Sequence, residues 1–218
     1  MQSPLTEARR KKYTIVLNGD ELSKFDITSR PPVPGGFSER AGRILGLFAP
    51  DVMSYEIDRL KTSEPSLAEM IRTAIKFLRR NEKGFFLMVE SGRIDHACHQ
   101  NDAGTLLKEL LAFDEALGIA YKFAKEDKKT LLIITGDHET EGVGISYCRK
   151  GQKTDYGSEE NLRILEKQNS SFEKIFEEMG EKLSVELVQE LVQKSLGIAL
   201  SDSEAKIVVE AKPQTSFF

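Results

Sequence analysis

Residues 84–99 read GFFLMVESGRIDHACH, an apolar run that leads directly into a group of metal-binding residue types. A second stretch, residues 131–138, reads LLIITGDH and repeats this change from apolar to ligand-bearing residues. The chain has three histidines in 218 residues, and all of them, His96, His99 and His138, fall within these two stretches. Random placement would rarely produce this pattern, so the two stretches are the candidate centre of the molecule's chemistry.

Both apolar runs have the length and composition of buried β-strands. Continuous apolar runs of this length are typical of parallel strands that are covered by helices on both faces. Residues 84–90 and 131–136, with the long helical pattern between them, predict a right-handed βαβ crossover. We therefore expect an α/β fold, a three-layer sandwich with a largely parallel central sheet.

Carboxylates and imidazoles follow each predicted strand, at the end where parallel sheets bind their ligands. Glu90 ends the first strand, and Asp137 and His138 end the second. Asp95 and His99 are four residues apart, so on a helix they project from one face and can share a cation. Carboxylate and imidazole together suit zinc, whereas a carboxylate among oxygen ligands suits magnesium. Five candidate ligands suggest more than one metal ion.

Each of these residues also has a simpler explanation when it is considered alone. Asp95 could cap the following helix, His99 could be a solvated helix residue, and Glu90 could be a carboxylate that faces water. An Asp-His pair at a strand end is often only the start of a loop. The metal site is favoured because every histidine lies in one of the two stretches in which a predicted strand ends.

The order of these residues resembles that of the alkaline phosphatase family. Residues 90–99, ESGRIDHACH, and residues 135–140, TGDHET, are similar to the family's V-E-G-x-x-I-D-x-x-x-H and T-A-D-H patterns. Weaker similarity extends over roughly residues 13–180, for example at 47–49, 81–86 and 113–116. The resemblance implies hydrolysis of phosphate monoesters with two zinc ions and one magnesium ion as cofactors.

The resemblance also implies a role for each matched residue. Glu90 would bind magnesium, Asp95 and His99 the first zinc, and Asp137 and His138 the second zinc. His96 matches a position that in several relatives lies near the phosphate, often through water. The family further implies phosphate monoesters or inorganic phosphate as partners, a homodimer, and a periplasmic or extracellular location.

Several family motifs have no match in this sequence. The nucleophile motif D-S-A is missing, and the nearest string, residues 202–204, is in the wrong place. The early aspartate that bridges zinc and magnesium, the arginine region that grips phosphate, and the late H-T pair with its zinc histidine are also missing. Gly136 replaces the usual alanine and Glu141 a usual glycine. We therefore expect a partial alkaline phosphatase domain that supplies no nucleophilic serine and is inactive alone.

The whole chain has the composition of an ordinary globular protein. Its hydrophobic content is 39% and its charged content is 30%, which allows one large α/β domain over residues 1–218. A formal net charge of −4 argues against a general nucleic-acid binder. Two cysteines, Cys98 and Cys148, are too few for a disulfide framework. The sequence does not decide whether a single disulfide joins them. We recognise no signal peptide.

The remaining elements follow from periodicity and capping signals. We expect strands at 13–17, 43–48 and 142–146. Helices are expected at 21–25, 66–81, from about 95 or 101 to 125, and at 158–168, 172–179, 184–195 and 201–209. Residues 1–12 should be frayed, 30–36 should form a surface loop, 51–63 should be irregular, and 150–153 should form a turn.

Two other interpretations remain open. The first is another enzyme of the same broad superfamily, but such relatives usually have more histidine near the second cluster. The second is a non-catalytic metal-binding or interaction fragment from a split or truncated gene. Intact ligands without a nucleophile are consistent with this second interpretation.

Overall fold

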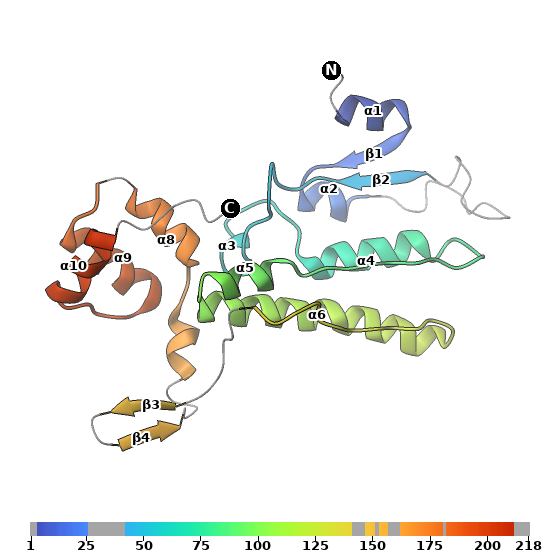
Figure 1. Ribbon diagram of the computed structural model, residues 1–218. Coiled ribbons are helices and arrows are strands. Elements are labelled where there is room, and N and C mark those ends of the chain that lie inside the picture. The colour runs from blue at the N-terminus through green and yellow to red at the C-terminus, as the bar shows by residue number, and fades with distance from the viewer. Residues whose placement is uncertain are drawn as a thin grey trace. The chain divides into compact units, whose positions relative to one another are not determined.

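A computed structural model describes residues 4–25, 42–140, 147–150, 153–156, 162–180 and 182–211 (Figure 1). Contacts divide the chain into two compact units. The first unit contains Met1–Ser91 and Leu111–Thr135, and the second contains Gly92–Leu110 and Gly136–Phe218. The single partial domain stays a prediction.

The described helices and strands alternate only at the start of the chain, and helices predominate after β2. In chain order they are α1 Pro4–Arg10, β1 Tyr13–Val16, α2 Gly19–Ser23, β2 Arg43–Gly46, α3 Glu56–Arg59, α4 Leu67–Leu78, α5 Arg93–His99, α6 Ala103–Asp127, β3 Tyr147–Lys150, β4 Lys153–Tyr156, the 3-10 helix η1 Arg163–Lys167, α8 Phe172–Met179, α9 Val185–Leu196 and α10 Asp202–Ala211. No helix among these described elements is long and apolar enough to cross a membrane.

The first unit contains a short parallel sheet made of β1 and β2, which confirms strands at both predicted positions. The register pairs Tyr13 with Arg43 and Val16 with Gly46. Between the two strands, α2 begins where Asn18 accepts a 2.8 Å hydrogen bond from the backbone of Glu21, as its capping signal predicts. The parallel pairing supports the predicted α/β class.

Helix α4 begins with the predicted capping box. The Ser66 side chain accepts from the backbone of Glu69, and the Glu69 carboxylate accepts from the backbone of Ser66. These two bonds satisfy donors that an isolated helix start leaves unpaired. One face of α4 then packs against α6, which lies alongside it (Figure 1). The buried members of this core are Ala68, Ile71, Ile75 and Ala116.

The predicted strands at 84–90 and 131–136 are not strands in this structure. Both segments are extended, but within the described residues no hydrogen-bond ladder joins residues 85–90 or 131–134 to another segment. Side chains nevertheless alternate between partly buried and exposed over residues 85–88 of the first segment. Leu87 packs against the α4 and α6 core, whereas Phe86 is 86% exposed. Apolar runs predict burial on two faces, and the described part of this unit covers only one of them.

Three further expectations need correction, and two others lie outside the described residues. Residues 1–12 were expected to be frayed, but Pro4–Arg10 form a helix, on which Glu7 and Arg10 form an ion pair of 2.7 Å. The irregular segment 51–63 contains the helical turn α3. The predicted helix at 158–168 is described only from 162 and forms η1 there. The expected loop at 30–36 and strand at 142–146 lie outside the described residues.

The second unit combines α5 and the start of α6 with a hairpin and three later helices. Strands β3 and β4 pair in antiparallel fashion with Lys150 opposite Lys153, on either side of the predicted turn. Helices α8 and α9 begin at the caps Ser171 and Ser184. With α10 they enclose a second core, whose buried members are Ile175, Met179, Val188, Leu191, Val192 and Ala205.

Candidate metal centre

Helix α5 carries the first pair of predicted ligands. Asp95 lies in its first turn, where the helix dipole favours a carboxylate, and His99 lies in its last turn. Their spacing of one turn brings His99 Nε2 to 3.6 Å from Asp95 Oδ2. The two side chains are 44% and 39% exposed, so solvent reaches both of them.

The second pair, Asp137 and His138, lies on the loop that follows the extended segment 131–136. His138 Nε2 is 3.5 Å from Asp137 Oδ2. His138 Nδ1 is 3.1 Å from the carbonyl oxygen of Glu139, which can only accept, so we assign the ring proton to Nδ1. This assignment leaves the lone pair on Nε2, beside the carboxylate. A histidine that binds a metal through one ring nitrogen commonly donates from the other in this way.

Thr140 brings the two pairs together. Its hydroxyl donates a 2.6 Å hydrogen bond to Asp95 Oδ1, and its Oγ1 lies 3.4 Å from His138 Nδ1. One threonine therefore contacts a residue of each pair, although it lies 45 positions from Asp95 in sequence. The structure therefore brings Asp95 of the first motif stretch and His138 of the second into contact with the same threonine.

The same contacts influence the protonation of Asp95. The hydrogen bond from Thr140 lowers the pKa of Asp95 below its usual value, and the nearby imidazoles of His99 and His138 lower it further. Asp95 is therefore a carboxylate at neutral pH. Ionised carboxylate is the form that binds a cation.

His96 points toward different partners. Arg93 Nη1 lies 2.9 Å from His96 Nδ1, and Arg93 Nη2 donates a 3.0 Å bond to Glu173. Burial, followed by the neighbouring Arg93, lowers the pKa of His96 and favours the neutral ring. Since arginine only donates, His96 Nδ1 accepts and the ring proton lies on Nε2. This arrangement supports a hydrogen-bonding rather than a ligating role for His96.

Cys98 is a free thiol in this structure and is partly buried. Burial, with a smaller contribution from the charge of Asp95, raises the pKa of Cys98. Thiols bind metal as thiolates, so these surroundings favour the packing role that the sequence suggests. The side chain of Cys148 lies outside the described residues.

The donor set of both pairs fits a zinc ion. A tetrahedral zinc with ligand distances of about 2.0–2.2 Å separates two of its ligand atoms by roughly 3.3–3.5 Å. The observed separations are 3.6 and 3.5 Å, longer than a hydrogen bond and close to this value. No group of three or more His, Cys, Asp and Glu residues that could hold a metal ion occurs within the described part of the chain. Each pair would therefore supply two of the three or four ligands that a protein zinc site uses.

Glu90 is an exposed residue of the first unit, and its binding of magnesium stays a prediction. The sequence interpretation assigned no role to Thr140, Arg93 and Glu173. Thr140 follows a recognised motif, and a hydroxyl near predicted ligands was a usable signal. Glu173 lies 80 residues from Arg93 on a separate helix, and no local pattern could link the two.

Comparison with known proteins identifies the family. The family model described as alkaline phosphatase matches residues 6–203. The chain belongs to the alkaline phosphatase family. It is 47% identical over 103 residues to alkaline phosphatase 3 of Bacillus subtilis, which covers 47% of this chain and 22% of that protein. It is 39% identical over 132 residues to the membrane-bound alkaline phosphatase of Bombyx mori, which covers 61% of this chain and 22% of that protein.

A solved structure supports the same assignment. The alkaline phosphatase of Thermus thermophilus superposes with a TM-score of 0.81 and 35% identity, over 96% of this chain and 41% of that one. The family resemblance and the α/β class are therefore confirmed. The chain spans about two fifths of this structural relative and about a fifth of the two curated alkaline phosphatases.

Proposed function

We propose that this chain provides part of the binuclear zinc and magnesium centre of a phosphomonoester hydrolase. In this proposal Asp95 and His99 bind one zinc, Asp137 and His138 bind the other, and Glu90 binds magnesium. The substrates are phosphate monoesters. The contact of Thr140 with both Asp95 and His138 carries the proposal, because it joins the two motif stretches that the family resemblance assigns to the two zinc ions.

Bound zinc ions would polarise the oxygens of a phosphoryl group and stabilise the charge that develops on them. The chain's own residues prepare this centre. Thr140 orients the Asp95 carboxylate by donating to Oδ1, which leaves Oδ2 directed toward His99. The carbonyl of Glu139 keeps the His138 proton on Nδ1 and the lone pair on Nε2. Neutral His96, with its proton on Nε2, can donate a hydrogen bond to a phosphate oxygen or to a water beside it.

The chain alone should not turn over substrate. Its sequence contains no D-S-A motif for a nucleophilic serine, and no histidine follows His138 to complete a zinc site. We further propose an extracytoplasmic location and a homodimer, both from the family resemblance. The relative from Bombyx mori, described as membrane-bound, is consistent with a location at a membrane surface.

The second candidate function is a non-catalytic metal-binding or interaction chain. The observation that favours it is the combination of two ligand pairs with no group of three ligands among the described residues. Both candidates predict metal binding, and both predict no turnover by the isolated chain, so only a positive activity result separates them. Hydrolysis of p-nitrophenyl phosphate that depends on Asp137 would exclude the non-catalytic candidate and the inactivity of the isolated chain.

Zinc binding by single variants tests the proposed ligand pairs. Wild type, His99→Ala and His138→Ala would be titrated with zinc by calorimetry at neutral pH. Each alanine variant should lose one zinc site and retain the other. Thr140→Val, which removes the hydroxyl but keeps the shape, should weaken zinc binding by about 10- to 100-fold, the usual effect of losing a group that orients a ligand. Thr140→Ser is the matched control and should bind like wild type.

The outcomes separate clearly. Unchanged zinc stoichiometry in both histidine variants would exclude these residues as ligands. Wild-type binding by Thr140→Val would show that the link between the two pairs does not organise them. Failure of the wild-type chain to bind zinc would contradict preformed sites.

A further inference from the structure

Helix α5 is held at both of its ends by the first two residues of helix α8. At the start of α5, Arg93 Nη2 donates a 3.0 Å hydrogen bond to Oε2 of Glu173. Just beyond its end, Asp102 Oδ2 accepts a 2.7 Å hydrogen bond from the backbone of Phe172. The two predicted ligands of α5, Asp95 and His99, lie between these anchors in sequence.

The anchor at Arg93 is well shielded from solvent. The Arg93 side chain is 12% exposed and that of Glu173 is 38% exposed. Partial burial reduces the screening that makes most surface ion pairs weak. The same guanidinium lies 2.9 Å from His96 Nδ1, so it is fixed by contacts on two sides.

The anchor at Asp102 is fully buried and rich in hydrogen bonds. Its carboxylate accepts from the backbone and the hydroxyl of Thr105, from the side-chain amide of Gln168 and from the backbone of Phe172. Its own backbone N–H donates to the carbonyl of Ala97 within α5. Burying a carboxylate is costly unless its oxygens are satisfied, and here four donors satisfy them. This cost restricts Asp102 to one position.

Helix α5 needs such anchors because it cannot fix its own position. It has seven residues, its N-cap is Gly92, and no side chain caps its start. Helices this short are unstable in isolation and depend on tertiary contacts. The rotation of α5 about its axis determines where Asp95 and His99 point, and one anchor at each end fixes that rotation.

We propose that Arg93 and Asp102 are positioning residues for the metal ligands Asp95 and His99. They brace α5 against the N-terminal turn of α8 so that both ligands face one cation. The inference rests on the proposed function, since it takes this pair to be a metal site. The inference adds Arg93, Asp102 and helix α8 to the parts of the chain on which that site depends. The partners of Arg93 and Asp102 in α8 lie 70 residues or more from them in sequence.

Cobalt binding tests the brace without any need for enzymatic activity. Co²⁺ replaces zinc in sites of this type and has visible absorption bands that report its ligand geometry. Two backgrounds isolate the pairs: His138→Ala leaves the α5 pair, and His99→Ala leaves the pair at Asp137 and His138. Glu173→Gln removes the charge at one anchor with little change in shape.

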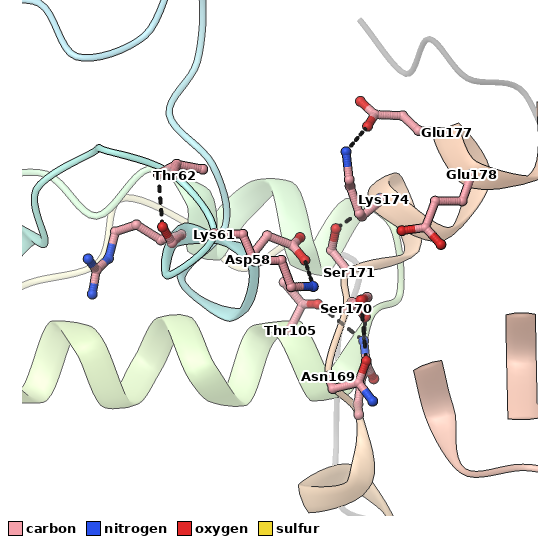
Figure 2. Close-up of polar contacts among 12 residues, drawn as sticks. Asp58, Lys61, Thr62, Thr105, Asn169, Ser170, Ser171, Lys174, Glu177 and Glu178 are labelled. Carbon is pink, nitrogen blue, oxygen red and sulfur yellow. Dashed lines mark hydrogen bonds and ion pairs between the residues drawn. The ribbon is translucent and has the colours of Figure 1, made fainter. Parts of the chain in front are cut away.

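Glu177→Gln is the matched control, because it makes the same substitution on the same helix. Glu177 forms an exposed ion pair of 2.8 Å with Lys174 of the same helix (Figure 2). In the His138→Ala background, Glu173→Gln should weaken Co²⁺ binding by about tenfold, the lower end of the range for groups that orient ligands. The same substitution should also alter the visible bands. In the His99→Ala background it should have no effect. Glu177→Gln should have no effect in either background, and Glu173→Asp should partly restore binding.

Each other result overturns the inference. Equal weakening of both pairs by Glu173→Gln would mean general loosening of the fold rather than positioning, and no weakening would mean that α5 needs no brace. Asp102→Asn, read in the same two backgrounds, repeats the test at the buried anchor. If neither histidine background nor the wild-type chain binds Co²⁺, the proposed metal site itself fails, and this outcome is distinct from a failure of the brace alone.

Discussion

Replacing Gly104 with alanine should destabilise the protein, although alanine is the better helix former. Gly104 is the second residue of α6, and a Cβ built there would lie 2.1 Å from Oε1 and 2.6 Å from Cδ of Gln168. Comfortable contacts between such atoms are about 3.5–4.0 Å. Gln168 is buried, and its amide nitrogen donates to Asp102, Thr105 and the carbonyl of Ser170 at 2.6, 3.2 and 3.0 Å. It therefore cannot move away without breaking these bonds.

The size of the destabilisation follows from the hydrogen bonds of Gln168 that must break. A hydrogen bond to a charged group is worth about 1.5–3 kcal/mol and an ordinary one about 0.5–1.5 kcal/mol. The helix preference of alanine over glycine returns about 1 kcal/mol. We expect Gly104→Ala to lower the free energy of unfolding by about 1–3 kcal/mol, in the range of other overpacking substitutions.

Gly118, further along the same helix, is the matched control. A Cβ at this position meets nothing within 4 Å, so Gly118→Ala should stabilise by about 0.5–1 kcal/mol. Urea unfolding followed by far-UV circular dichroism measures both variants. A Gln168→Ala background removes the obstacle, and there Gly104→Ala should become neutral or stabilising. Stabilisation by Gly104→Ala in the wild-type background would refute the rigid packing of Gln168 against α6.

Two further predictions concern the first unit. Ser66→Ala should destabilise by about 1 kcal/mol through loss of the α4 cap, as measured by urea unfolding. Hydrogen bonds from Ser66, first from its backbone, lower the pKa of Glu69, so this contribution is present above the unfolded-state pKa of Glu69 and is lost as the pH falls through its folded-state pKa. Ser66→Ala keeps the backbone N–H that lowers this pKa most and removes the 3.0 Å hydrogen bond from the hydroxyl to the Glu69 carboxylate. Its deficit should therefore shrink in acid only by the contribution of that hydroxyl, and a deficit that grows in acid would contradict the capping box. Leu87→Ala should destabilise by about 1–3 kcal/mol because Leu87 packs against the α4 core, whereas Phe86→Ser should stay within about 0.5 kcal/mol of wild type. Equal effects of these two substitutions would contradict the alternation of this extended segment.

The sequence predicted best where a local pattern determines the structure. The capping box at Ser66 and the one-turn spacing of Asp95 and His99 both involve residues within four positions of each other. Such contacts form whenever the helix forms, so spacing alone identifies them. The family motifs added the pairing of two distant stretches, which local patterns do not contain.

Strand formation was predicted less well, because a strand exists only with its neighbour. The apolar run at 85–89 predicted a strand buried on both faces, but only one side of this segment, including Leu87, packs against a core. Hydrogen bonding depends on a second backbone at the right distance, and no residue within the run reports whether that backbone is there. The pairing of β1 with β2 was equally hidden, although both strands were predicted.

The metal centre illustrates the same division at the level of chemistry. Ligand types are visible in the sequence, because a cation requires carboxylate and imidazole whatever the fold. In the proposed centre, their orientation depends on Thr140, on the carbonyl of Glu139 and on the contacts of α5 with α8, which come from separate parts of the chain. A ligand that points in the wrong direction binds no better than an absent one. Variants of Thr140 and Glu173 should therefore lose metal affinity while every predicted ligand remains in place.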